Sequence, residues 1–135
     1  MKPLVISPND TSLYQPGVCN IGPAEIARRR RVGHIGVGVT VALLVGLIAL
    51  HAPPLARLIV ALPAAMAATG YLQARLHFCA GFGSRGVFNF GELGRVVEVV
   101  DPAARARDRR RSMQVGLASV AIGVAVGVLA VLLPF

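Results

Sequence analysis

The sequence predicts an all-α integral membrane protein with three transmembrane helices, and three observations support this fold class. Of the 135 residues, 55% are hydrophobic and 15% are charged, whereas roughly 25% of residues are charged in soluble domains. The mean hydropathy is +0.66. The apolar residues fall in long blocks, each able to cross a hydrocarbon core of about 30 Å. These observations argue against an ordinary water-soluble domain.

The chain is expected to begin with an irregular cytoplasmic arm over residues 1–27, because Pro, Gly, Asn and Asp recur there. A helix is expected to start at Pro23, with Glu25 near its positive amino end. A run of arginines then leads into a transmembrane hairpin over residues 28–77, whose first span is predicted at about 32–50. The run consists of Arg28, Arg29, Arg30 and Arg31.

The second span of the hairpin is predicted at about 55–74. Before it, Pro53 and Pro54 break the helix, because proline lacks an N–H donor and disfavours helical geometry in the residue before it. Arg57 lies near this turn, and we expect its side chain to extend toward the headgroups. The many alanines of the span favour burial against other helices.

Residues 78–101 are predicted to form a cytoplasmic interfacial loop rich in glycine and phenylalanine. Its phenylalanines are expected to enter the interfacial layer or to pack on the helix ends. Residues 102–135 are predicted as one long helix, since Asp101 suits the N-cap and Pro102 the first helical position. The third span is expected at about 113–133, and the preceding turns extend into the cytoplasm.

The distribution of positive charge predicts the orientation. Of the 14 Lys and Arg residues, all but Arg57 lie on the side of the amino terminus and the long connection. That side is expected to be cytoplasmic and the carboxyl terminus outside, in a bacterial inner membrane. Anionic lipid is expected at this rim, above all at Arg28–Arg31 and at Arg109, Arg110 and Arg111. Nucleic acid is not an expected partner, because no recognition motif accompanies the charge of +8.

Small residues in two of the spans predict close helix packing. One strip follows the third span, and a second set lies in the first span. The neighbouring helix is either one of this chain, one of a second copy, or one of another subunit. The residues concerned are Gly116, Ser119, Gly123, Gly127, Gly33 and Gly36.

Two histidines and two cysteines are candidate ligands or reactive groups. His34 and His77 lie in or beside the spans, where an imidazole can ligate a chlorophyll-type pigment or a haem. Cys19 and Cys79 face a reducing compartment, so no structural disulfide is expected, and nearby arginines favour thiol reactivity. No firm cofactor, no metal site and no catalytic constellation is predicted.

The layout resembles a known family of small bacterial inner-membrane hairpins. Cys19-Asn-Ile-Gly22, an arginine cluster, an apolar hairpin and Phe78-Cys79 before a glycine-rich sequel are similar to the YgaP-type, rhodanese-associated transmembrane domain, over residues 19–90. The resemblance implies an inner-membrane protein with a link to sulfur or thiol chemistry. The third span and the charged helix before it depart from that family's two-helix pattern.

These patterns lead to one functional expectation and two alternatives. We expect a non-catalytic accessory or structural subunit that binds larger subunits of a membrane complex, with respiratory or photosynthetic electron transfer as candidate hosts. The first alternative is a thiol- or sulfur-handling membrane protein that uses Cys79 and Cys19. The second is a pigment- or haem-binding subunit that uses His34 or His77.

Overall fold

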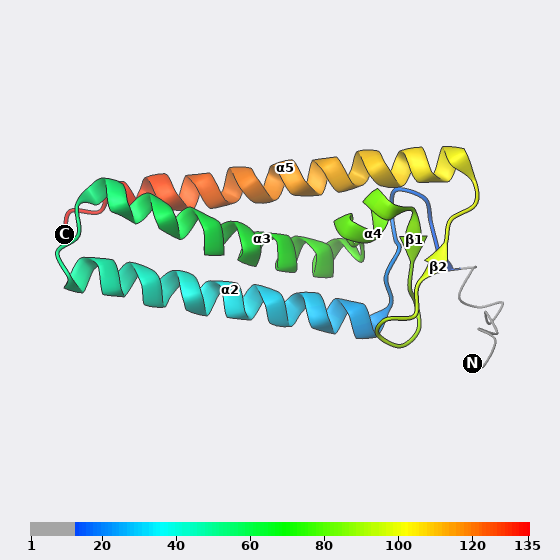
Figure 1. Cartoon of the computed structure of the whole chain (residues 1–135), viewed down its shortest axis with the longest axis horizontal. Helices are drawn as coiled ribbons and strands as arrows, with labels where there is room; N and C mark the ends of the chain where they lie inside the picture. Colours follow the sequence, from blue (N-terminus) through cyan, green and yellow to red (C-terminus); the bar gives the residue numbers. More distant parts are fainter. Residues whose placement is uncertain (1–12) are drawn as a thin grey trace. The chain divides into compact units, whose positions relative to one another are not determined.

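The computed structural model describes residues 13–135, and these residues are mostly helical (Figure 1). Residues 1–12 of the expected arm lie outside the described part. In chain order the elements are α2 (Pro23–Ala49), the 3-10 helix η1 (Pro54–Val60), α3 (Ala61–Leu76), α4 (Ala80–Arg85), β1 (Val87–Phe88), β2 (Val97–Glu98) and α5 (Pro102–Leu132).

Three helical stretches of the described chain are long and apolar enough to cross a membrane. They are Pro23–Ala49, Pro54–Leu76 and Pro102–Leu132. The predicted fold class, an all-α membrane protein with three spans, is therefore confirmed.

The helix ends follow from local sequence. The chain leaves α2 through a turn in which His51 has a φ of +55°, and η1 begins at Pro54. The α-helical part of the second span starts at Ala61, which places Pro63 in the first turn of α3. At that position a missing N–H costs little, since the first-turn donors have no partner within an α-helix. At the start of α5, the Asp101 carboxylate accepts the Ala103 N–H at 3.1 Å.

The chain forms two compact units, each described by itself. The loop-rich unit contains residues 13–28 of the described chain and Gln73–Gln114. The three-helix unit contains Arg29–Leu72 and Val115–Phe135. Residues of α2, α3 and α5 contribute to both units.

In the three-helix unit, α3 packs against both α2 and α5 (Figure 1). Arg57 of η1 is 3% exposed, and its guanidinium donates to the carbonyls of Ala130 at 3.4 Å and Leu133 at 3.1 Å, and to the main-chain oxygen of Phe135. The expectation that Arg57 extends to the headgroups is wrong. The last carbonyls of a helix lack helical donors, and Arg57 supplies donors to those of α5.

In the loop-rich unit, β1 and β2 form an antiparallel ladder that pairs Val87 with Glu98 and Phe88 with Val97. The segment before α2 adds to the other side of β1. Ile21 forms a parallel bridge with Asn89, and the Gly22 N–H donates to the Asn89 carbonyl at 2.9 Å. The expected arm is thus partly ordered by main-chain pairing.

The interior of the loop-rich unit is built from residues of the expected interfacial loop. Phe78, Phe82 and Phe88 are buried, with Phe78 fully inaccessible. Ile21 and Cys79 pack with Phe82. Residues 78–101 are thus not an irregular loop, and their buried phenylalanines pack within the unit, while the interfacial placement of the segment stays a prediction. That segment contains α4 and a hairpin, because its aromatic side chains find apolar partners within the protein.

Buried polar side chains tie the segments of this unit together. Asn20 is fully buried, and its side chain both donates to the Cys79 carbonyl at 3.1 Å and accepts the Cys79 N–H at 2.6 Å. Gln73 likewise accepts the Ala80 N–H at 2.9 Å. Asp108 of α5 is fully buried and accepts the Tyr14 hydroxyl at 2.5 Å and the Gly17 N–H at 2.7 Å.

Candidate functional site

The predicted packing glycines of the first span face α3. A Cβ at Gly33 would lie 2.8 Å from the Tyr71 ring, and one at Gly36 would lie 2.7 Å from the Ala67 nitrogen. Real Cβ atoms do not approach other heavy atoms this closely, so only glycine fits at either position. Part of the predicted close-approach surface is therefore occupied by a helix of the same chain.

The predicted strip on the third span is divided. A Cβ at Gly123 would lie 2.6 Å from the Ala65 methyl carbon, and one at Gly127 would lie 3.0 Å from that of Ala61. Ser119 is buried and its hydroxyl donates to the Val115 carbonyl of the same helix.

Gly116 does not belong to this packed strip. It has open space where its side chain would be. Gly116 lies seven residues before Gly123 and therefore on nearly the same face of α5, but no other helix of the described chain approaches it. Its role as a packing residue stays a prediction, with a helix of a second copy or of another subunit as the remaining partner.

A different small-residue strip of α2 has no partner within the described chain. A Cβ added at Gly38 or at Gly46 would have nothing within 4 Å, and Ala42 between them is exposed. Residues four apart share one helix face, so these three positions form one narrow face. We call Gly38, Ala42 and Gly46 the free strip.

His34 is exposed and its Nδ1 lies 2.6 Å from the Tyr71 hydroxyl oxygen. The two rings meet edge to face, with centroids 5.4 Å apart. Tyr71 therefore fixes the orientation of the imidazole. His77 is exposed and has a φ of +54°; it belongs to the loop-rich unit and His34 to the three-helix unit.

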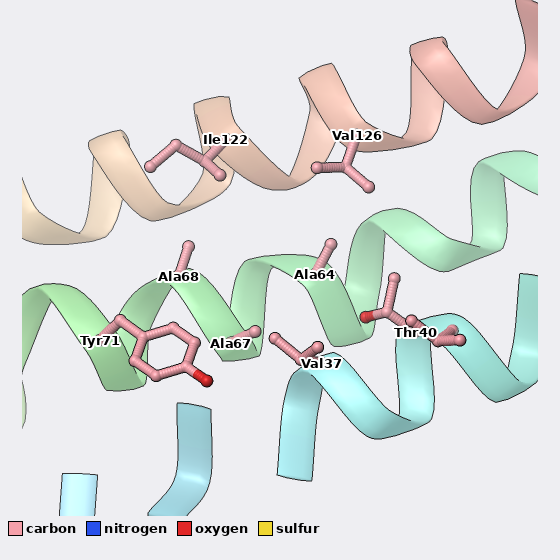
Figure 2. Close-up of a pocket in the computed structure, with 9 residues that line it drawn as sticks. Val37, Thr40, Ala64, Ala67, Ala68, Tyr71, Ile122 and Val126 are labelled. Carbon is pink, nitrogen blue, oxygen red and sulfur yellow. The ribbon is translucent and has the colours of Figure 1, made fainter. Parts of the chain in front are cut away.

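An apolar pocket of about 250 Å³ lies between the helices of the three-helix unit. Figure 2 shows side chains of all three spans converging on it. Thr40 directs its hydroxyl to the Gly36 carbonyl at 2.7 Å and so offers no free donor. Small-molecule sites usually measure about 300–1,000 Å³, so this pocket is too small to enclose a macrocycle. The lining residues are Val37, Thr40, Val41, Ala64, Ala67, Ala68, Tyr71, Ile122 and Val126.

Cys19 and Cys79 form no disulfide. Cys79 is buried at 4% exposure among apolar side chains. Burial raises the pKa of the Cys19 thiol, and its contact with the Ile21 carbonyl only partly offsets this. A raised pKa lowers the thiolate fraction, and the thiolate is the reactive form. The environment of these cysteines gives the thiol alternative no support, and it stays a prediction.

The predicted arginine rim has two parts. In the first, Arg28, Arg30 and Arg31 are exposed and Arg29 is half-buried. In the second, Arg109 and Arg110 are exposed, whereas Arg111 is half-buried and lines an open groove beside the turn at Gly17. Among residues 13–135, no group of three or more His, Cys, Asp or Glu side chains is arranged to hold a metal ion.

The sequence reasoning missed two buried polar residues that organise the structure, Asp108 and Asn20. Asp108 stands among five arginines and looks like part of a solvated charged helix. One available signal was that Ser112 follows Asp108 by four residues, so that the two small polar side chains share a helix face distinct from that of the arginines on either side. Asn20 carried no such signal, because its partners are main-chain groups 59 positions away.

Comparison with protein-family models, with curated proteins and with solved structures gives no match for this chain. Its resemblance to the rhodanese-associated hairpin stays a prediction from the residues quoted above. The functional argument therefore depends on three features of the structure: three apolar spans, a folded loop-rich unit, and the free strip on α2.

Proposed function

We propose that the protein is a non-catalytic accessory or structural subunit of a larger complex in a bacterial inner membrane, which it joins through the free strip of α2. The observation that carries the proposal is the open space at Gly38 and Gly46, beside the exposed Ala42. In lipid there is no hydrophobic force between helices, so association relies on close backbone approach at small residues. A face that contacts only acyl chains gains nothing from such residues.

The other close-approach glycines support this assignment by contrast. Gly33, Gly36, Gly123 and Gly127 are all used within the three-helix unit. The internal packing of the spans is therefore complete without Gly38 and Gly46, which leaves their strip for another helix. Respiratory or photosynthetic electron-transfer complexes are candidate hosts.

The charge distribution supports an orientation with the loop-rich unit in the cytoplasm. Except for Arg57, every Lys and Arg of the chain lies in the amino-terminal segment or in the connection between the second and third spans. Positive charge is retained on the cytoplasmic side of a membrane. In this orientation the loop-rich unit is the part of the protein that meets cytoplasmic segments of a host.

Purification from native membranes in a gentle detergent tests the proposal. Mass spectrometry should find stoichiometric larger subunits with the wild-type chain and with Gly116→Leu, but not with Gly38→Leu. Gly116 is the matched control, because it also has open space at its Cβ but is followed four residues later by Val120 instead of a small residue. A wild-type chain that purifies alone, or equal loss of partners from both variants, would contradict the proposal.

A second candidate is a pigment- or haem-binding subunit, favoured by the 2.6 Å contact between His34 and Tyr71. A ligating imidazole commonly has its other ring nitrogen held by a hydrogen bond, which fixes its orientation. An absorption spectrum of the same preparation tests this candidate. A visible band that is lost in His34→Leu and kept in His77→Leu would support it. A colourless preparation in which haem and pigment extraction also gives nothing would reject it.

A further inference from the structure

The loop-rich unit contains an open basic groove of about 240 Å³. One wall is the first part of α5, and the other is the turn around Gly17. We call this the basic groove. Its lining residues are Pro16, Gly17, Arg107, Arg110, Arg111 and Gln114.

The groove arises from helical spacing. Arg110, Arg111 and Gln114 follow Arg107 by three, four and seven residues. This spacing places all four on one face of a helix. Arg109 lies about 200° around the helix from Arg107, at roughly 100° per residue, and it does not line the groove. The sequence Arg109-Arg110-Arg111 therefore contains two groove arginines and one on the opposite face.

The second wall is fixed in place. The Gly17 N–H donates to the Asp108 carboxylate at 2.7 Å. Gly17 also has a φ of +70°, and a Cβ there would lie 3.3 Å from the Arg107 Cβ. The turn thus rests directly on α5, and the groove is formed before any ligand binds.

The guanidinium groups of the groove lack acidic partners in the described chain. No ion pair between residues 13 and 135 involves Arg107, Arg110 or Arg111. The neighbouring Asp108 is fully buried, and both its oxygens are used by Tyr14 and Gly17. Excess positive charge therefore gathers on one side of α5.

Arg111 provides the second observation. Its Nε is shielded from solvent and has no hydrogen-bond partner in the described part of the protein, while its Nη1 makes a long contact of 3.5 Å with Gln114. A buried donor without an acceptor is unfavourable. Because this Nε is covered by protein, an anion in the groove would be held by the outer guanidinium nitrogens of Arg111, which make no ion pair in the described chain.

We propose that the basic groove is a binding site for a phosphate ester, held by Arg107, Arg110 and Arg111. Planar guanidinium groups donate paired hydrogen bonds that match phosphate oxygens. The apolar part of α5 follows Gln114 directly, so a lipid headgroup is the favoured source of the phosphate. This site is narrower than a general attraction of anionic lipid to the arginine rim, and it does not depend on the accessory role.

Native mass spectrometry of the detergent-purified chain, titrated with phosphatidylglycerol or with diacylglycerol, a lipid that lacks the phosphate, tests the site. Arg110→Gln should weaken phosphatidylglycerol binding about tenfold, the typical consequence of losing a charged hydrogen bond. Arg109→Gln removes the same charge from the opposite face and should change binding less than about twofold. Arg110→Lys keeps the charge but loses the planar fork, and it should fall between them.

The source of the phosphate is decided by competition. If a lipid is bound, millimolar inorganic phosphate leaves phosphatidylglycerol binding unchanged. If a free phosphate is the ligand, inorganic phosphate displaces the lipid in the wild type, and Arg110→Gln is less sensitive to it. Equal losses in Arg109→Gln and Arg110→Gln, at equal helical content by circular dichroism, would overturn the proposal, as would equal binding of the two lipids.

Discussion

The two units of this chain are stabilised by different kinds of contact. In the loop-rich unit, polar side chains such as Asn20 and Asp108 are fully buried and hydrogen-bonded to distant segments. In the three-helix unit, the closest approaches are between glycines and alanines, as at Gly36 against Ala67 and Gly123 against Ala65. The loop-rich unit also contains glycines that leave no room for a Cβ, as at Gly83 beside Ser112. The difference between the units therefore lies in the buried polar side chains that join distant segments of the loop-rich unit.

This difference fits the proposed orientation, in which the loop-rich unit lies in water and the three spans lie in lipid. A small folded unit in water gains stability by burying aromatic side chains, and its buried polar atoms must then be paired. Helices in lipid gain little from burying apolar side chains against each other, so they rely on close van der Waals contact. Removing a buried polar partner should therefore destabilise the loop-rich unit, and adding a carbon where two spans touch should destabilise the three-helix unit.

The largest effect is expected from Asp108→Ala, which removes one carboxylate and leaves the Tyr14 hydroxyl and the Gly17 N–H without their acceptor. Hydrogen bonds to a charged group contribute about 1.5–3 kcal/mol each, so the loss of two should lower the free energy of unfolding by about 3–6 kcal/mol. Denaturant unfolding in detergent micelles, followed by near-ultraviolet circular dichroism, measures this change. The control Asp101→Ala removes an exposed N-cap and should cost about 1 kcal/mol. Equal losses in both variants would show that burial of Asp108 contributes nothing.

Arg57→Met is expected to have the next largest effect, and it tests an exception within the three-helix unit. Arg57 is a buried polar group there, and its loss leaves the carbonyls of Ala130 and Leu133 without their side-chain donor. We expect a loss of about 2–4 kcal/mol. Arg75→Met, at an exposed position near the end of α3, should change stability by less than about 0.5 kcal/mol. If the two methionine variants unfold alike, Arg57 does not stabilise the end of α5.

Gly36→Ala tests the opposite mechanism, the addition of one carbon. Its Cβ would lie 2.7 Å from the Ala67 nitrogen, so α2 and α3 must separate. Overpacking of this kind costs about 1–3 kcal/mol. Gly38→Ala adds the same carbon two residues away, where nothing lies within 4 Å, and should change stability by less than about 0.5 kcal/mol. Unfolding in detergent compares the two, and a Gly38→Ala chain that loses as much as Gly36→Ala would contradict the assigned helix faces.

The sequence was sufficient to predict the spans, because their length and hydropathy are local properties. It also located the helix breaks, as at Pro54, and the start of α5 at Pro102. It could not tell which small residues face a neighbour. That depends on how closely the neighbouring helix approaches at each level along the axis, so Gly123 and Gly116, which share one face of α5, look alike although only Gly123 meets another helix.

The loop-rich unit was missed for a different physical reason. Its contacts join residues far apart in the sequence, such as Asn20 with Cys79 and Tyr14 with Asp108. Without those partners, phenylalanines beside a span look like interfacial anchors. The basic groove could not be predicted for the same reason. Its arginines form an ordinary charged helix face until the turn at Gly17, about 90 positions away in the sequence, supplies the second wall.

The smallest effect is expected from Tyr14→Phe, which removes only one hydrogen bond to Asp108 and should cost about 1–2 kcal/mol at neutral pH. Its pH dependence is the sharper test. Burial, then the hydrogen bond to Asp108, then the charges of Asp108 and Asp101 raise the pKa of Tyr14 in the folded protein. An unfolded tyrosine titrates near a pKa of about 10.

Above that pH the unfolded chain has lost a proton that the folded chain still holds, so the stability of the wild type should fall as pH rises further. Tyr14→Phe lacks this titration, and its deficit relative to the wild type should shrink between about pH 10 and pH 11.5. Paired unfolding curves across that range measure the deficit, and groups common to both chains, including Cys19, cancel in the comparison. A deficit that stays constant with pH would mean that the Tyr14 hydroxyl is not held by Asp108. The contact that joins the segment before α2 to α5 would then have to be assigned to the Gly17 N–H alone.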